Sequence, residues 1–136
     1  MLIFKSQHTY LGGGLDIQKF ITKLSPGLPW AKYRGEYHIP GHNFSGPGTS
    51  LIHRMNLKTG QPYPNSRPIN RVDLASSKHD LLYYKYKDLP RRHQADLQMI
   101  QELQNIPNPT LREKIERAFV IKILQQKRKW GLGLSI

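Results

Sequence analysis

The sequence predicts an all-α fold in which two antiparallel helices stand beside a glycine-rich loop and a third helix packs on them. Residues 70–86, 90–105 and 110–129 repeat apolar positions at steps of three and four, as amphipathic helices do. Short breaks that contain proline or are followed by it separate these stretches, and proline cannot continue a preceding helix. The chain of 136 residues is long enough for one domain with a modest core.

The composition limits the classes of partner and compartment. Lys and Arg number 21 against 9 Asp and Glu, a formal charge of +12, which predicts a polyanionic partner: nucleic acid, an anionic membrane surface, or both. The chain has no cysteine, so disulfides and thiolate metal sites are excluded. No apolar run reaches the ~18 residues of a membrane span, and the N-terminus does not resemble a signal peptide. We therefore expect a soluble or peripheral protein.

The first predicted helix, residues 70–86, carries the most distinctive chemistry. Asn70 can cap its start, and Asp73 places a negative charge in its first turn, where the helix dipole favours it. The three- and four-residue steps put His79 on the inward side, and Asp80 is turned about 100° around the helix from it. The two side chains can therefore serve different partners. The inward side comprises Val72, Ala75, Ser76, His79, Tyr83 and Tyr86.

The second predicted helix begins near Pro90 and runs to about residue 105. His79 lies about eight residues before the break and Asp96 about six after it, or ~12 Å and ~9 Å along the two helices. In an antiparallel pair these residues are nearly level. A carboxylate at that height can hold one imidazole nitrogen and leave the other as a general base. The inward side is predicted to hold His93, Asp96, Leu97, Ile100 and Leu103 or Gln104.

The third predicted helix opens with a capping box, Thr110 to Glu113. Its apolar residues occupy more than one face, so we expect it to be wedged against the other helices. It ends in Lys127-Arg128-Lys129-Trp130, which is a solvated helix terminus, a membrane-contact patch or a nuclear-import signal. The apolar residues are Leu111, Ile115, Ala118, Phe119, Val120, Ile121, Ile123 and Leu124.

The N-terminal arm, residues 1–37, contains three consecutive glycines at 12–14, which predict a hinge, and an apolar stripe at 17–24, which predicts a short amphipathic helix. Trp30 follows, with Lys32 and Arg34 near it. Either the arm docks its apolar face on the main domain, or Trp30 and the cations anchor it in a lipid headgroup layer.

Residues 37–67 are rich in Gly, Pro, Asn and Ser and show no periodicity, which predicts one long ordered loop. Within it, Gly46-Pro47-Gly48 allows a tight curl whose carbonyl oxygens point one way. A hard cation such as calcium uses such oxygens as ligands, although ordinary turns share this composition.

Together these residues closely resemble the phospholipase A2-like domain at the N-terminus of parvovirus minor capsid proteins. The resemblance rests on Asn70-x-x-Asp73-x-Ala75-x-x-x-His79-Asp80-x-x-Tyr83, preceded by Gly46-Pro47-Gly48 and followed by Ala95-Asp96. It covers roughly residues 38–130, with the arm at 1–37 and a C-terminal tail at 131–136 outside it. It implies a phospholipase A2-like fold: a calcium loop, two antiparallel catalytic helices and a third packing helix.

The resemblance also implies an activity, calcium-dependent hydrolysis of the sn-2 ester of membrane glycerophospholipids. It implies that His79 activates a water, that Asp96 holds His79 and that Tyr83 steadies the pair. Two positions depart from the family: Phe44 stands where Tyr is usual, and Thr49 where Asn is common. The implied Ca²⁺ ligands are the carbonyls of Phe44, Gly46 and Gly48 and the carboxylate of Asp80.

The implied partner is a phospholipid membrane surface, with anionic lipid favoured and nucleic acid secondary. The resemblance further suggests a virion or secreted protein that acts at a host endosomal membrane and aids viral penetration. The alternatives are a catalytically silent, basic nucleic-acid-binding module and a module that disrupts membranes without hydrolysis. Loss of His79 or Asp80 would favour these alternatives, and both residues are present.

Overall fold

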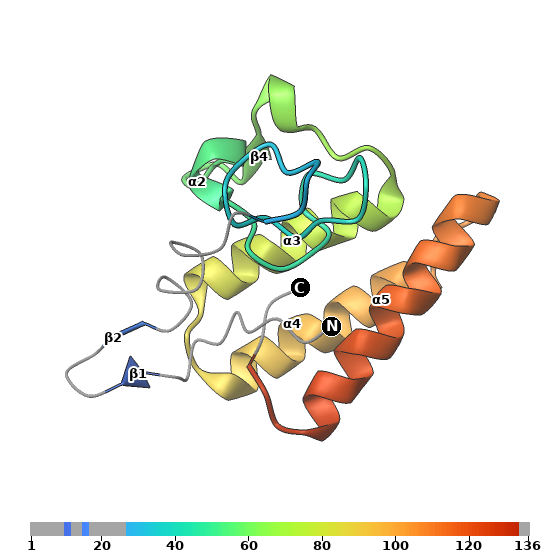
Figure 1. Cartoon of the computed structure of the whole chain (residues 1–136). Coiled ribbons are helices and arrows are strands. Elements are labelled where there is room, and N and C mark those ends of the chain that lie inside the picture. Colours follow the sequence, from blue (N-terminus) through green and yellow to red (C-terminus); the bar gives the residue numbers. More distant parts are fainter. Residues whose placement is uncertain (1–9, 12–14, 17–26, 134–136) are drawn as a thin grey trace.

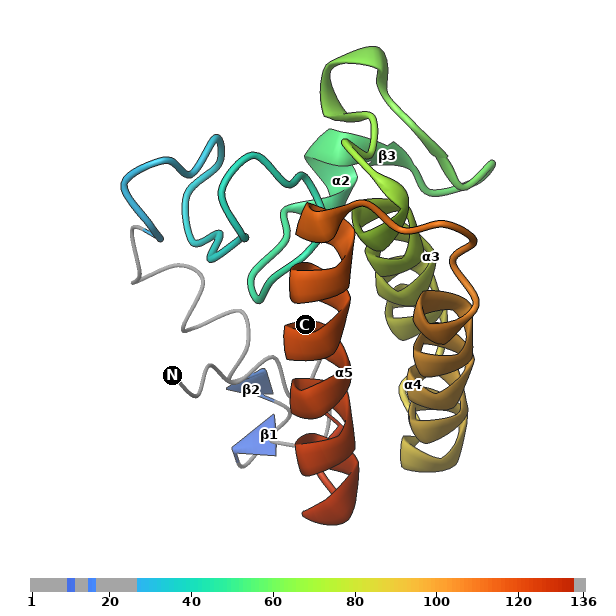
Figure 2. The ribbon, with the colours of Figure 1, turned by 90° about the vertical axis from the view of Figure 1, so that its right-hand side faces the viewer.

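Three long helices dominate the computed structural model, which describes residues 10–11, 15–16 and 27–133. They are α3 (Arg71–Lys85), α4 (Leu89–Gln104) and α5 (Leu111–Lys129). A short connection turns α4 back alongside α3, and α5 packs on both (Figures 1 and 2). None of the helices in these described ranges combines the length and apolar character needed to cross a membrane.

Side-chain caps fix where the three helices begin. The Asn70 side chain accepts the backbone N–H of Asp73, and the Asp88 side chain accepts that of Arg91, with Pro90 in the first turn of α4. Thr110 forms the predicted capping box at the start of α5. Each cap satisfies a backbone donor that the first helical turn would leave without a partner. The predictions at Asn70 and Thr110 are confirmed.

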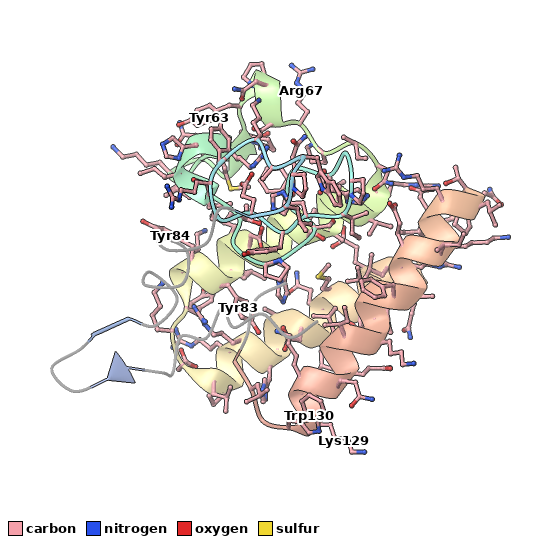
Figure 3. The ribbon with its side chains drawn as sticks, in the orientation of Figure 1. Tyr63, Arg67, Tyr83, Tyr84, Lys129 and Trp130 are labelled. Atoms are coloured by element: carbon pink, nitrogen blue, oxygen red, sulfur yellow. The ribbon has the colours of Figure 1, made fainter. Side chains whose placement is uncertain are left out.

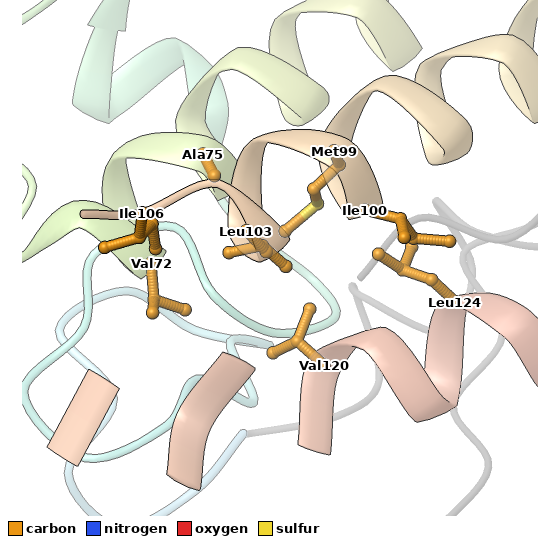
Figure 4. Packing of buried hydrophobic residues seen from close by; sticks show 8 residues of the cluster. All are labelled: Val72, Ala75, Met99, Ile100, Leu103, Ile106, Val120 and Leu124. Atoms are coloured by element: carbon orange, nitrogen blue, oxygen red, sulfur yellow. The ribbon is translucent and has the colours of Figure 1, made fainter. Parts of the chain in front are cut away.

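The apolar core lies where the three helices meet (Figure 4). Each large apolar side chain buried there contributes about 1.5–3 kcal/mol to folding. One position predicted for the inner side of α4 is wrong, since Leu97 is 42% exposed. Of the alternatives Leu103 and Gln104, Leu103 is the buried one and Gln104 is exposed. Asp96 takes the inward position, which turns its neighbour Leu97 outward. The core residues are Val72, Ala75, Met99, Ile100, Leu103, Ile106, Val120 and Leu124.

The prediction that α5 is wedged against the other helices holds, since it packs on both α3 and α4, but its outer side leaves apolar residues exposed. Leu111, Ile115 and Phe119 are 74%, 63% and 58% exposed. They recur at steps of four, so they form one stripe along the helix. The inner side instead buries Glu113 and Glu116 beside the apolar core residues.

The region predicted as one long loop contains short elements after residue 50. They are α2 (Leu51–Arg54), the antiparallel strands β3 (Met55–Asn56) and β4 (Gln61–Pro62), and the 3-10 helix η1 (Pro64–Ser66). Elements of two to four residues are too short to show a periodic pattern. Residues 37–50 are irregular as predicted, as are residues 57–60, 63 and 67 between the short elements.

A second antiparallel pair, β1 (Tyr10–Leu11) with β2 (Leu15–Asp16), lies in the N-terminal arm. The all-α prediction therefore holds for the large elements, and the part of the chain that the structure describes adds two small two-stranded sheets. The predicted hinge at 12–14 and the predicted amphipathic helix at 17–24 lie outside the described residues.

Candidate active site

A histidine and an aspartate meet between α3 and α4. His79 Nε2 lies 2.7 Å from Asp96 Oδ1, and both side chains are buried. The sequence prediction that the two residues are level is therefore confirmed. Tyr83, one turn after His79, donates its hydroxyl to the same Asp96 oxygen at 2.7 Å, and its ring lies 4.4 Å from the imidazole. Figure 3 shows Tyr83 between the helices.

A lysine from α5 completes this cluster. Lys127 is only 3% exposed, and its Nζ lies 2.8 Å from Asp96 Oδ1 and 2.5 Å from the Tyr83 hydroxyl. The prediction that Lys127 belongs to an exposed basic terminus is therefore wrong. Lys127 follows Val120 and Leu124 at helical spacing and so shares their inward side. This spacing is the feature of the sequence that indicates the burial of Lys127.

The electrostatics of the cluster keep Asp96 ionised. Burial alone would raise the pKa of Asp96, but the hydrogen bond to His79 and the charge of Lys127 outweigh burial and hold that pKa below its ordinary value. Burial and the nearby Asp96 charge raise the pKa of Tyr83 far above its ordinary value, so its hydroxyl keeps its proton. An ionised carboxylate only accepts hydrogen bonds. Asp96 therefore favours the imidazole tautomer that carries its proton on Nε2.

Arg92 supports the same cluster from α4. Its guanidinium donates to the carbonyl oxygens of Tyr83, at 2.5 Å, and Tyr86, at 2.7 Å, near the end of α3. It also lies 4.4 Å from the centre of the Tyr83 ring. Helix ends leave carbonyls without intrahelical partners, so this buried arginine fixes the turn that carries Tyr83. Sequence reasoning missed it because its partners are main-chain atoms.

The irregular segment before α2 folds back on itself. Tyr37 N donates to Pro47 O, and Ile39 N to Ser45 O, each at 2.9 Å. Gly46 has φ +146, and a Cβ there would lie 2.2 Å from the Tyr37 carbonyl oxygen. A Cβ on Gly48, with φ +78, would lie 1.9 Å from the Gly35 carbonyl oxygen. Only glycine fits at these two positions.

Asp73, in the first turn of α3, holds this segment in place. Its carboxylate accepts the consecutive backbone N–H groups of Asn43 at 3.0 Å, Phe44 at 2.8 Å and Ser45 at 3.1 Å. Burial alone would raise the pKa of Asp73, but His42 and these amides lower it overall. The sequence marked Asp73 only as a first-turn charge. Its role as a loop anchor depends on a tertiary contact that spacing does not reveal.

A buried ion pair fastens the flanks of the segment. Both Arg54 Nε and Arg54 Nη2 donate to the Glu36 carboxylate, at 2.8 and 2.7 Å. Glu36 also accepts the Ser50 N–H at 2.9 Å, and Arg54 donates to the Asn43 side chain at 2.8 Å. A paired and hydrogen-bonded geometry of this kind offsets the cost of burying two charges. Glu36 thus fastens the two flanks of the segment, and Asp73 holds its middle.

The oxygen atoms expected to bind calcium are of the chemical type that calcium prefers, and two of them lie close together. The carbonyl oxygens of Phe44 and Gly46 converge, because both lie within 3.3 Å of the Thr49 hydroxyl, whose single hydrogen can be donated to either. Asp80 is buried beside His79. Carbonyl and carboxylate oxygens are the ligands that calcium prefers. Within the described ranges no three His, Asp or Glu side chains cluster as a metal site, so a metal here would depend on backbone oxygens.

Comparison with protein-family models shows which family this chain resembles. The phospholipase A2-like domain family matches residues 35–126. The chain belongs to this family. The resemblance drawn from the sequence is thereby confirmed, and a phospholipase A2-type function is supported in general terms. Comparisons with curated proteins and with solved structures give no match. The predicted boundaries at 37 and 130, and the roles of individual residues in this phospholipase A2-like domain, stay predictions.

Proposed function

We propose that this protein is a calcium-dependent phospholipase A2, which hydrolyses the sn-2 ester of membrane glycerophospholipids. The observation that supports this most is the 2.7 Å contact between His79 and Asp96 in a buried site. Family membership supports the same reaction class. A buried imidazole held by a carboxylate is the arrangement that a general base requires.

In the proposed reaction, His79 accepts a proton from a water molecule on Nδ1, while Nε2 stays bonded to Asp96. The water oxygen attacks the ester carbonyl carbon and forms a tetrahedral oxyanion. Collapse breaks the bond to the sn-2 oxygen, and the proton on His79 returns to that oxygen. The products are a fatty acid and a lysophospholipid. Such proton transfer contributes about 10²–10⁴-fold to the rate.

Calcium, when bound, would polarise the ester carbonyl and offset the charge of the oxyanion. We infer that the carbonyls of Phe44, Gly46 and Gly48 and the carboxylate of Asp80 hold it. The glycines permit the curl of the loop, and Asp73 fixes that curl against α3. Thr49, whose hydroxyl lies within 3.3 Å of two of these carbonyl oxygens, would keep them oriented.

The test is release of fatty acid from phosphatidylcholine vesicles, with millimolar calcium in one arm and a chelator in the other. We expect release with calcium and at least a hundredfold less with chelator, because oxyanion stabilisation accounts for rate factors of about 10²–10³. Equal release in both arms would remove calcium from the mechanism. No release in either arm would favour the catalytically silent alternatives.

We also propose that the outer side of α5 binds an anionic phospholipid membrane. Its apolar stripe, Leu111, Ile115 and Phe119, is exposed and is accompanied by exposed Lys114 and Lys122. Both acids of α5 are buried on its inner side. The outer side therefore presents apolar, cationic and neutral amide side chains without an acid, and a lysine near an anionic membrane contributes about 1 kcal/mol.

Two further aromatic residues extend this proposal. Figure 3 shows Trp130 at the C-terminal end of α5, where it is exposed. Trp30 is exposed in the arm as well, and its indole N–H donates to the His38 carbonyl oxygen at 2.9 Å. Tryptophan favours the headgroup layer. Action at a host endosomal membrane stays a prediction from the resemblance.

Phe119→Ser tests whether the outer side of α5 binds the membrane. Leu97→Ser, an equally drastic change at an exposed position of α4, is the control. Vesicle binding, measured by cosedimentation, should fall several-fold for Phe119→Ser and stay at the wild-type level for Leu97→Ser. Binding should also rise with the fraction of phosphatidylserine and fall with salt. If Phe119→Ser instead lowered only the affinity for DNA or RNA, this face would belong to the nucleic-acid-binding alternative.

A further inference from the structure

The feature that neither the sequence nor the family match explains is the buried cation beside the His79–Asp96 pair. Lys127 comes from α5, whereas His79 and Asp96 come from α3 and α4. The family match ends at residue 126, so it does not include Lys127. Burying an ammonium group is costly unless it is paired. This position therefore has a charged residue where an apolar one would fill the space at lower cost.

The hydrogen bonds around Asp96 Oδ1 have a fixed direction. An ammonium group has three donors and no acceptor. Lys127 therefore donates both to Asp96, at 2.8 Å, and to the Tyr83 oxygen, at 2.5 Å. Because the Tyr83 oxygen receives this bond, its own hydrogen is directed onward to Asp96, where the contact is 2.7 Å. Lys127 thus sets the orientation of the Tyr83 hydroxyl.

Three donors from three positions converge on the same oxygen. His79, Tyr83 and Lys127 all approach Asp96 Oδ1 within 2.8 Å. Tyr83 and His79 share α3, so both would move with that helix. Lys127 ties Asp96 to α5 as well. A carboxylate held from two helices resists the rotation that would let the imidazole change its tautomer or its tilt.

We propose that Lys127 is a positioning residue for the His79–Asp96 pair, through its ion pair with Asp96 and its hydrogen bond to Tyr83. This inference rests on the proposed function, and it makes α5 a part of the active site. A lysine retained only for packing or for solubility would have no effect on turnover beyond its effect on folding.

The kinetic test compares Lys127→Met, Lys127→Arg and Lys129→Met on dispersed short-chain phosphatidylcholine at saturating calcium. Methionine keeps most of the length of the side chain and removes the charge and the donors. We expect Lys127→Met to lower kcat about 10–100-fold, as loss of such a supporting group does, with KM unchanged. Lys127→Arg should recover part of kcat, because it keeps the charge. Lys129→Met, at an exposed position of the same helix, should match wild type.

A second readout does not depend on activity. Nitrogen-15 NMR of the His79 ring should show one tautomer, protonated on Nε2, in the wild-type protein and a mixture in Lys127→Met. Wild-type kcat in folded Lys127→Met, or an unchanged tautomer, would overturn the inference. If the wild-type protein does not hydrolyse phospholipid, the proposed function fails, and the NMR comparison still decides the role of Lys127. Should Lys127→Met not fold, Lys127→Gln takes its place with the same expected results.

Discussion

Side chains form the helical half of the candidate site, whereas main-chain groups form the loop half. In the helical half, His79 and Asp96 face each other from α3 and α4 and bond directly. In the loop half, residues 37–50 fold back on themselves, and the carbonyls of Phe44 and Gly46 lie near the Thr49 hydroxyl. Asp73 and Glu36, which lie outside this segment, hold it in place. The first half depends on helix register, and the second on buried acids that do no chemistry themselves.

This difference leads us to expect that the two halves fail in different ways. A change at His79 or Asp96 should lower turnover and leave calcium affinity intact, because neither is a proposed calcium ligand. Asp80 is the exception on α3, because its carboxylate is a proposed ligand. A change in the loop half should weaken calcium binding and leave turnover at saturating calcium largely intact. Asp73 joins the halves, since it belongs to α3 and holds the loop.

Asp96→Asn should produce the largest effect. The amide cannot supply the charge that stabilises the imidazolium, and it can hold the wrong tautomer of His79. We expect kcat to fall about 10²–10⁴-fold, the contribution of general base catalysis, with calcium affinity unchanged in a calorimetric titration. Asp88→Asn is the matched control, because Asn also caps a helix well. A parallel loss of calcium affinity in Asp96→Asn would break the proposed division between the halves.

Asp73→Asn should produce the next largest effect, now in the loop half. It removes the charge that three consecutive amides share and leaves His42 beside a neutral group. We expect a loss of stability on the order of 3 kcal/mol, measured by urea unfolding, and calcium affinity at least tenfold weaker. Turnover at saturating calcium should stay near wild type. Full calcium affinity with lost turnover would mean that Asp73 serves the helical half instead.

The smallest effect concerns pH and an ion pair outside both halves. The hydrogen bond with Arg71 lowers the pKa of Glu113 from 4.5 to about 2. A depressed carboxyl pKa gives stability that is fully present above pH 4.5 and is lost as pH falls toward 2. Wild type should therefore be more stable than Glu113→Gln at pH 6, and the difference should shrink below pH 4.5. A difference that grew with acidity would contradict the ion pair between α3 and α5.

The sequence predicts the helical half well because helix geometry is regular. Asn70 and Thr110 mark two helix starts, and a fixed rise per residue places His79 level with Asp96. It predicts the loop half only as a glycine pattern and a family resemblance. The contacts that shape the loop, above all those of Asp73, join residues about thirty positions apart and follow no period.

Lys127 shows where local rules mislead. A Lys-Arg-Lys run at the end of a helix is normally solvated and interacts with the helix dipole. The tertiary environment overrides that rule, because Asp96 on α4 supplies a buried negative charge at the height of Lys127. The same helix shows the opposite case, since the apolar residues Leu111, Ile115 and Phe119 are exposed. From polarity alone one would expect Lys127 to be exposed and these three apolar residues to be buried.

The most direct test of the central claim is to compare His79→Gln with Asp80→Asn in two assays, calorimetric binding of calcium and release of fatty acid from phosphatidylcholine vesicles. We predict that His79→Gln loses turnover and still binds calcium with nearly wild-type affinity, because His79 is the proposed base and not a ligand. Asp80→Asn should lose both. Wild-type turnover in His79→Gln, or undiminished calcium binding in Asp80→Asn, would contradict the account.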